Sequence, residues 1–420
     1  MSTIDAPRVR AVARVGPQLP TEQEAATLRR RHRPGQLGPV NVLQIIGLEV
    51  ALVLAVLGWR ASGWPRWVLF GCAVLLPLLV FARVRGRWLA ERVVLRSRYR
   101  RRRASARLIS DDRRLTALRD LAPELTVETV DAVGGTRLGV GRDGAGWFAA
   151  IALHPSRGLR GEEQAVPPLD TLARSLADAG QPGCVVQVVV HTVPGRVGSG
   201  DNPSAESYRE LLRPFDGSTV AAAPVSVGDQ ACWVVVRIEA RAVAEVAVDE
   251  PEAIGEVPAV LGALVRRVGN VLKRGGFAHR VLDGDGLLDA LVQSLAAEVT
   301  PAGVERAAGT EAWDSWRAAG LEHRCYWVRA WPAPDECGAL LAELYRAPAA
   351  LTSLSLAVTP TPGGGELRCL ARVADAPGAV GSAVAGLRTA ARSHGAQLFP
   401  LDGEQAPATY ATAPTGVGVR

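Results

Sequence analysis

Two long apolar runs near the N-terminus constrain this chain more than any other feature. The first, VNVLQIIGLEVALVLAVLGW, spans residues 40–59, and the second, WVLFGCAVLLPLLVFARV, spans residues 67–84. Each run is about as long as a helix that crosses a bilayer, which needs roughly 20 apolar residues. The gap between them, RASGWPR, contains a glycine and a proline and is too short for anything but a turn. The sequence therefore predicts an antiparallel transmembrane hairpin over residues 40–84.

The arginines around these runs predict how the hairpin is oriented. Seven arginines precede it within residues 1–39 and ten lie in residues 83–103, whereas the turn has only Arg60 and Arg66. Basic residues flanking a membrane helix mark the cytoplasmic side. No small-residue cleavage site follows the first run, so a signal peptide is not predicted. We expect a multi-pass protein of the inner cell membrane, with both termini and residues 104–420 in the cytoplasm.

Aromatic and acidic side chains in the hairpin are candidates for interfaces. Trp59, Trp64 and Trp67 cluster at the turn, where amphipathic rings would lie at the level of the headgroups. Glu49 lies near the middle of the first run, where a carboxyl group is costly unless it faces protein or water. A proton or substrate path is one interpretation of Glu49. We favour a protonated acid bonded to another helix of an assembly, because neither run has a second ionisable residue in its middle.

The Arg-rich stretch RVRGRWLAERVVLRSRYRRRR (83–103) continues from the second run. Arg83, Arg85 and Arg87 are expected at an anionic inner leaflet, where each basic residue gains on the order of 1 kcal/mol. If the membrane helix continues inward, Trp88, Leu95 and Tyr99 form one stripe, since they recur at helical spacing. This stripe would lie on the membrane or pack on a neighbouring subunit.

The basic charge is confined to the first part of the chain. Residues 1–120 carry 23 basic and 8 acidic side chains, a net +15, whereas residues 121–420 carry 25 and 34, a net −9. An acidic domain of this size is a poor match for a phosphate backbone, so nucleic-acid binding is not predicted. None of the six cysteines forms a C-x-x-C pair, and most lie in apolar runs, as single buried thiols do.

Strand and helix patterns alternate through the rest of the chain, in the order β-α-β-β-α-β, and then repeat. Both halves finish on Leu-Asp-Gly, at residues 282–284 and 401–403. We therefore predict an α+β fold with two tandem ferredoxin-like units in the cytosol. The predicted boundaries are a disordered tail (1–39), the hairpin (40–84), an Arg-rich juxtamembrane helix and connector (85–136), the first unit (137–286, with an insertion near 195–229), a helical bridge (287–322), the second unit (323–405) and a C-terminal tail (406–420).

Motifs with possible chemistry are weak. GVGRDG (139–144) matches a dinucleotide fingerprint but precedes a strand rather than a helix, so a hairpin turn is favoured. Asp283 and Asp285 in LDGDG are two apart, as in some metal–nucleotide sites, but turns with this composition are commoner. None of the six histidines is spaced to form a metal-binding pair on a helix, and the sequence contains no P-loop or nucleophile-elbow motif. We predict no catalytic residue, no cofactor, no metal and no small-molecule substrate. The alternative is a membrane-tethered cytosolic enzyme that binds a nucleotide or nucleotide-sugar through these residues.

Four tryptophans cluster in AWDSWRAAGLEHRCYWVRAWP (312–332). Trp327 and Trp331 lie on one predicted strand and are expected to be partly buried in the core. Trp313 and Trp316 are predicted on a short helix, where they either complete the core or form an exposed anchor for a partner.

The order of these features resembles a known family. The hairpin followed by RGRWLAERVVLRSRYRRRR, and the C-terminal LDGEQAPATYATAPTG (401–416), are similar to EccE, a membrane component of the type VII (ESX) secretion apparatus of actinobacteria. The resemblance covers the chain from about residue 40 onward. It implies a non-catalytic structural subunit at the periphery of an inner-membrane complex with EccB, EccC and EccD, in which the EccC ATPase supplies energy. No active-site residues are carried over from this family.

Overall fold

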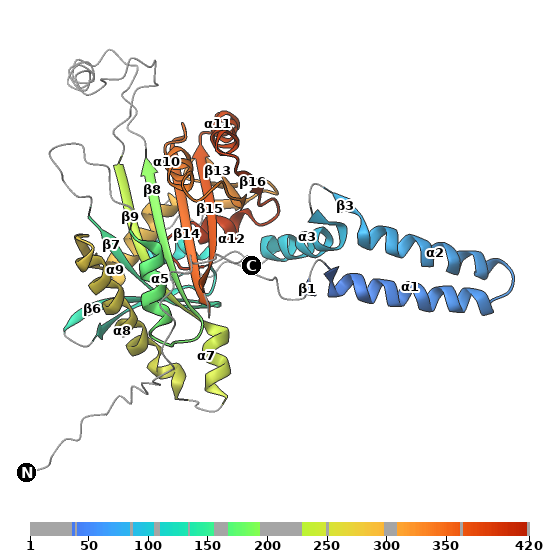
Figure 1. The fold of residues 1–420 in the computed structure, drawn as a ribbon, viewed down its shortest axis with the longest axis horizontal. Coiled ribbons are helices and arrows are strands. Elements are labelled where there is room, and N and C mark those ends of the chain that lie inside the picture. The colour runs from blue at the N-terminus through green and yellow to red at the C-terminus, as the bar shows by residue number, and fades with distance from the viewer. Residues whose placement is uncertain are drawn as a thin grey trace, which may run out of the picture.

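The computed structural model describes residues 36–37, 40–84, 87–104, 110–132, 135–154, 167–193, 229–248, 252–297, 309–361 and 364–417. The predicted tail, except for Gln36–Leu37, and the predicted insertion, except for Asp229, lie outside these residues. Figure 1 shows a pair of long helices extending from one side of a mixed helix-and-sheet body, with a shorter helix between the two parts.

The two extended helices are α1 (Val42–Arg60) and α2 (Trp64–Phe81), which run side by side (Figure 1). They approach closely because small residues lie between them: a Cβ at Gly47 would be 2.9 Å from the Val80 side chain. The turn between them uses Gly63, whose φ of 79° suits glycine. Before α1, β1 (Gln36–Leu37) pairs with β2 (Val40–Asn41). Among the described residues, one helix, α2, is long and apolar enough by the criteria of length and composition to cross a membrane.

A break separates α2 from the next helix. The short strands β3 (Arg83–Val84) and β4 (Arg87–Trp88) pair with each other, and α3 (Leu89–Ala104) follows directly. The expectation that the second long helix continues inward through the arginines is therefore wrong. Trp88 lies on β4 and not on the helical stripe with Leu95 and Tyr99.

The body is built on one 12-stranded sheet in which every strand pairing is antiparallel. The predicted α+β class is confirmed. The first half of the sheet contains β5 (Thr126–Ala132), β6 (Thr136–Asp143), β7 (Gly146–Leu153), β8 (Cys184–Val193), β9 (Asp229–Glu239) and β10 (His279–Val281). The second half contains β11 (Gly309–Glu311), β12 (Trp316–Ala318), β13 (Leu321–Ala330), β14 (Leu351–Thr361), β15 (Gly364–Asp375) and β16 (Gln397–Pro400).

The two halves have the same strand order. Neighbouring strands run β10-β7-β9-β8 in the first half and β16-β13-β15-β14 in the second, and β8 pairs with β14 to join them. A hairpin precedes each set, β5–β6 before β7 and β11–β12 before β13, and a helix follows each Leu-Asp-Gly, α9 (Gly284–Leu295) and α12 (Gln405–Ala411). Each half thus has a hairpin before, and a helix after, the elements that the sequence pattern predicted.

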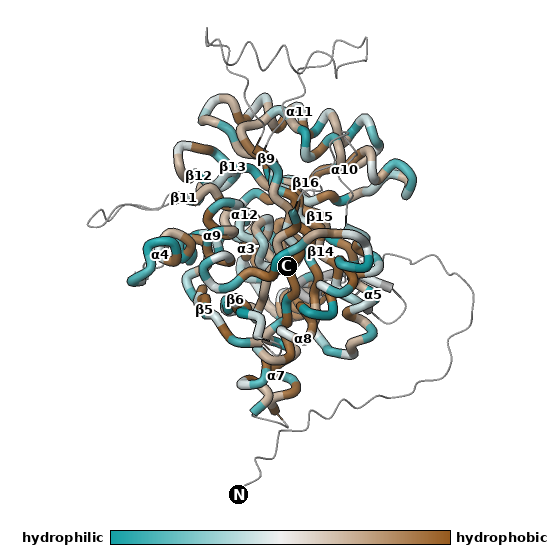
Figure 2. Tube along the Cα trace, turned by 90° about the vertical axis from the view of Figure 1, so that its left-hand side faces the viewer, coloured by the Kyte–Doolittle hydropathy of each residue, from teal (hydrophilic) through white to brown (hydrophobic). Residues whose placement is uncertain are grey.

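Helices cover both faces of the sheet. One face packs against α5 (Leu169–Ala177), α8 (Ala253–Arg274), α10 (Cys337–Tyr345) and α11 (Val380–Ser393), while the other packs against α4 (Arg113–Arg119), α9 and α12. A further helix, α7 (Ala240–Ala247), links β9 to α8. Figure 2 shows hydrophobic residues concentrated along the central strands and hydrophilic residues on α4. The hydrophobic core therefore lies on both faces of the sheet, between the strands and the helices that cover them.

The C-terminal segment, residues 401–417, contains the described part of the predicted tail (406–420), and this part does not extend away from the body. It is almost entirely buried against the second face, although it is rich in small residues and has few large apolar ones. Polar groups of the strands hold it in place, which explains why a segment of this composition is internal. Its bonds include Cys325 N to Gln405 Oε1 (2.9 Å), Gln187 Nε2 to Ala411 O (2.9 Å), Gly416 N to Gln187 Oε1 (2.7 Å), Tyr410 Oη to Asp143 Oδ2 (3.0 Å) and Arg237 Nη1 to Thr415 O (2.9 Å).

Two local expectations differ from the structure. Trp316 lies on strand β12 and is buried, and Trp313 lies in the β11–β12 turn, so neither is on a helix. The bridge expected to be helical therefore contains a β-hairpin as well as α9. Trp327 and Trp331 are partly buried, as predicted.

The motif GVGRDG (139–144) lies mostly within a strand. Gly139 and Gly141 are part of β6, and the chain turns only at residues 144–145, before β7.

Candidate membrane-proximal site

Helix α3 connects the extended helices to the body and is strongly basic. Its sequence, LAERVVLRSRYRRRRA, has seven arginines and no glycine or proline. Glu91 is in its first turn and Arg101, Arg102 and Arg103 are in its last, the charge order that favours a helix through its dipole. Its side chains divide into a face that docks on the body and a face that lines an open groove.

The docking face is formed by Leu95, Tyr99 and Arg102, which are spaced to lie on one side of the helix. Leu95 is only 6% exposed, and the Tyr99 ring meets the Trp313 ring edge-on, with centroids 5.4 Å apart. Gly403 completes the contact: its N–H donates to Trp313 O (2.5 Å), and a Cβ there would be 2.8 Å from the indole and 3.1 Å from Leu95. Leu95 and Tyr99 of the predicted stripe therefore pack on the chain's own body.

An ion pair fixes the inner end of α3. Arg102 donates to both carboxylate oxygens of Glu311, from Nε at 3.1 Å and from Nη2 at 3.0 Å, and also to Gly403 O at 2.5 Å. Glu311 additionally accepts a bond from Ala406 N at 3.1 Å. Because the Glu311 side chain is 5% exposed and that of Arg102 is 32% exposed, this pair is largely shielded from water. A bidentate, partly buried pair of this kind fixes orientation as well as adding energy.

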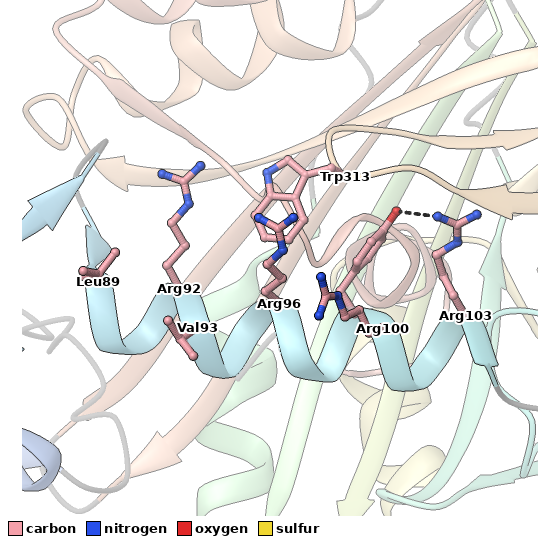
Figure 3. Close-up of a pocket in the computed structure, with 8 residues that line it drawn as sticks. Leu89, Arg92, Val93, Arg96, Arg100, Arg103 and Trp313 are labelled. Atoms are coloured by element: carbon pink, nitrogen blue, oxygen red, sulfur yellow. Dashed lines mark hydrogen bonds between the residues drawn. The ribbon is translucent and has the colours of Figure 1, made fainter.

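The groove runs along α3 beside the docking face, shares Tyr99 and Trp313 with it, and has a volume of about 800 Å³. Figure 3 shows Arg92, Arg96 and Arg103 projecting from the side of α3 on which Trp313 lies. Arg103 donates a hydrogen bond of 3.4 Å to Tyr99 Oη. The groove is lined by Leu89, Arg92, Val93, Arg96, Tyr99, Arg100, Arg103 and Trp313. This combination of guanidinium groups with apolar and aromatic surface suits an amphipathic anion.

The interface residues predicted in the extended helices lie on exposed surfaces. Trp59 and Trp64 are each 77% exposed and Trp67 is 74% exposed, all at the end of the pair that contains the turn. Glu49 is exposed on α1, and within the described part of the chain it has no ion-pair partner. These residues therefore do not converge with the groove, which lies at the opposite end of α2.

The residues predicted between α2 and α3 are described only in part. Arg83 and Arg87 belong to the paired strands β3 and β4, whereas Arg85 lies outside the described residues. The Trp88 ring meets the Phe81 ring edge-on, with centroids 6.3 Å apart, so it packs against the end of α2. The contacts of the three arginines with lipid stay a prediction.

The residues considered for nucleotide or metal chemistry have structural contacts. Asp283 caps α9 by accepting a bond from Gly286 N (3.0 Å), and Asp285 pairs with Arg114 (2.7 Å). A side chain at Gly139 would collide with the backbone of Asp283, so this glycine permits close packing. In the described part of the chain, no three His, Cys, Asp or Glu side chains are grouped so that they could hold a metal ion.

Titratable groups are buried on both faces of the sheet. Burial and the nearby Arg372 guanidinium lower the pKa of His191 to about 3, and the same causes hold the pKa of His323 well below its ordinary value. Arg372 bonds to Ser353 Oγ (2.8 Å) and to Ser294 O, and burial lowers its pKa to about 10. Burial also raises the pKa of the four buried thiols, to about 12 for Cys184, Cys232 and Cys369 and to about 11 for Cys325.

Sequence reasoning missed the partners of α3. Arg102 could have been found, because it lies three residues after Tyr99 and so extends the predicted stripe. Glu311 and Gly403 gave no such signal, since they are 209 and 301 residues away from Arg102. Trp313 was considered as an anchor for a partner, but its ring contacts this chain's own Tyr99.

Comparison with known families bears on one segment of the chain. A family model described as "Putative type VII ESX secretion system translocon, EccE" matches residues 226–328. This segment matches EccE. The match confirms the resemblance for the part of the chain from β9 to β13, and it includes Glu311 and Trp313, on which α3 docks.

Other comparisons add little. No curated protein matches the chain. Two solved structures of alkyldihydroxyacetonephosphate synthase, in two crystal forms, each share 8% identity with it and have a TM-score of 0.24. Each alignment covers 61% of this chain, and the chain spans 41% of the length of each synthase chain. Similarity at this level supports no conclusion on fold or function.

Proposed function

We propose that this chain is a non-catalytic structural subunit of a type VII (ESX) secretion complex in the inner membrane. The observation that carries the proposal is the EccE match over residues 226–328. The matched segment includes the strands and the turn that receive α3, which connects the body to the extended helices. The proposed role is to hold the cytosolic body at a defined position beside the membrane.

The exposed apolar surface of α1 and α2 supports membrane anchoring by both helices. Many large apolar side chains on them are more than a third exposed, a surface that water would disfavour and lipid would cover. The three exposed tryptophans at the turn fit one interface, and the arginines of α3 fit the cytoplasmic side. We infer a hairpin with its turn outside the cell and both termini inside.

The repeated strand order supports a duplicated body. An antiparallel β10-β7-β9-β8 order, with α5 and α8 on one face, is the arrangement that a βαββαβ series forms in ferredoxin-like units. The β16-β13-β15-β14 set repeats it. We infer two such units joined edge to edge. EccB, EccC and EccD are the partners that the family resemblance suggests, and the surface that would contact them is not assigned.

Cysteine labelling tests the proposed topology. Ser62, in the turn between α1 and α2, and Ser382, exposed on α11, would each be replaced by cysteine. A membrane-impermeant maleimide should label Ser62→Cys in intact cells, but Ser382→Cys only after lysis. Labelling of both, or of neither, before lysis would contradict the hairpin.

Complementation tests the function. In a strain that lacks the gene, the wild-type chain should restore export of type VII substrates, and a variant without residues 40–84 should not. Normal export in the deletion strain would count against a role in secretion. The enzyme alternative would gain support if a nucleotide, with or without divalent metal, raised the thermal stability of the full chain in detergent.

A further inference from the structure

The arginines of the groove have few counter-charges. Within the described residues, Arg92, Arg96 and Arg100 form no ion pair, and Arg103 bonds only to the hydroxyl of Tyr99 and lies over its ring. The buried acid close to α3, Glu311, is already bonded to Arg102. Four guanidinium groups therefore share one concave surface without a carboxylate. Such a surface concentrates positive potential and favours a negatively charged occupant.

The chemistry of the groove changes along its length. Leu89 and Val93 line it at the end where α3 begins, which is also the end nearer α2 in the chain, and Trp313 adds an aromatic wall. Arg92 lies between these two apolar residues in the chain, Arg96 follows one turn after Arg92, and Arg100 and Arg103 extend the row away from α2 (Figure 3). An occupant that matches this order has an apolar part near the membrane helix and a phosphate next to it.

We propose that this groove binds the headgroup of an anionic phospholipid from the inner leaflet, with its phosphate held by Arg92, Arg96 and Arg100. The proposal rests on the membrane anchoring proposed above, because α2 would then place the start of α3 at the level of the headgroups. Arginine suits this role because its planar fork donates two bonds to a phosphate. The bound lipid would add to the hold of the body on the membrane, beside the α1–α2 pair.

Two other anionic occupants fit the observations less well. A nucleic acid would have to approach a body whose residues 121–420 carry a net negative charge. An acidic protein segment would satisfy the arginines, but it gives no reason for the half-buried Leu89 and the exposed Val93 to line the groove at the membrane end. An anionic lipid accounts both for the positive charge of the groove and for the order of apolar and basic residues along α3.

Native mass spectrometry of the full chain in mild detergent would measure lipid binding. The probes are phosphatidylglycerol, cardiolipin and phosphatidylcholine, with glycerol 3-phosphate as the free headgroup. The groove variant is Arg96→Gln with Arg100→Gln. The control is Arg98→Gln with Arg101→Gln, which removes the same charge from the same helix but from residues that do not line the groove. Circular dichroism and gel filtration would establish that both variants are folded.

The wild type should bind both anionic lipids more tightly than phosphatidylcholine, and glycerol 3-phosphate should bind weakly. The groove variant should bind phosphatidylglycerol about tenfold to thirtyfold more weakly than the control, because two phosphate contacts are lost. Equal loss in both variants would overturn the proposal, as would equal affinity of the wild type for charged and neutral lipids. Tight binding of glycerol 3-phosphate would assign the groove to a free phosphoanion instead. If the groove variant binds lipid normally but loses an acidic protein from its complexes, the groove would be assigned to that protein. This result would overturn the lipid proposal.

Alkaline carbonate extraction separates this outcome from a failure of the proposed function. A wild-type chain that carbonate releases from membranes would contradict membrane anchoring, and the lipid proposal would fall with it. A chain that resists extraction but shows no preference for anionic lipid would overturn the groove proposal alone.

Discussion

Replacing Arg102 should release α3 from the body. Arg102→Met keeps most of the side-chain stem but removes three hydrogen bonds, two to Glu311 and one to Gly403 O. Removing one partner of a buried ion pair typically lowers the free energy of unfolding by about 3–5 kcal/mol, because the other charge is left unpaired. Since Arg102 is a third exposed and Glu311 keeps its bond from Ala406 N, we expect a smaller cost of about 2–3 kcal/mol.

Hydrogen exchange of the α3 peptide is the assay for this release. A helix of this length is marginal on its own in water, so its amides should exchange faster once it undocks. A cost of 2 kcal/mol corresponds to roughly thirtyfold faster exchange. Arg98→Met, an exposed position on the same helix, is the control. In a double-mutant cycle, Glu311→Gln should show a coupling of about 1–3 kcal/mol with Arg102→Met. Unchanged protection of α3 in Arg102→Met, or additive effects in the cycle, would refute the docking of α3 on the body through this ion pair.

Three further outcomes follow from buried contacts. Gly403→Ala should lower the free energy of unfolding by about 2–3 kcal/mol, because φ is 79° and a Cβ would press on an indole; Gly395→Ala, with a φ of 70° but open space, should lose only about 1 kcal/mol. Leu95→Ala should cost about 2–5 kcal/mol and speed exchange across α3, since it leaves a cavity. His191 and His323 have lowered pKa values in the fold, so the unfolded chain binds protons first as the pH falls. Each of these two histidines should therefore lower the free energy of unfolding by about 1.4 kcal/mol for every pH unit below roughly pH 6.5. Urea titrations of the full chain in detergent, near pH 7 and near pH 5, would measure these changes. An equal free energy of unfolding at the two pH values would contradict the prediction for the two histidines.

Much of the local structure could be predicted because it depends on nearby residues. The apolar runs at 40–59 and 67–84 became helices at Val42–Arg60 and Trp64–Phe81, and the strand predicted after GVGRDG (139–144) is β7. Their boundaries follow from continuous apolar sequence and from flanking glycine and proline.

The docking of α3 and the burial of the C-terminal segment could not be predicted in the same way. The stripe with Leu95 and Tyr99 showed that one side of α3 needs a partner, but not which one. The residues that receive it, Glu311 and Gly403, come from the β11–β12 hairpin and the turn before α12. The C-terminal segment is held by polar bonds to distant strands, and small residues with few large apolar ones look like a surface tail in sequence alone.

Purification of the tagged full chain from its native membranes, followed by mass spectrometry of the bound proteins, tests the central claim most directly. The proposal predicts that EccB, EccC and EccD are recovered with the wild-type chain in a mild detergent, in one large complex on sizing. Recovery of a monomer without any ESX component, from cells in which type VII secretion is active, would contradict it.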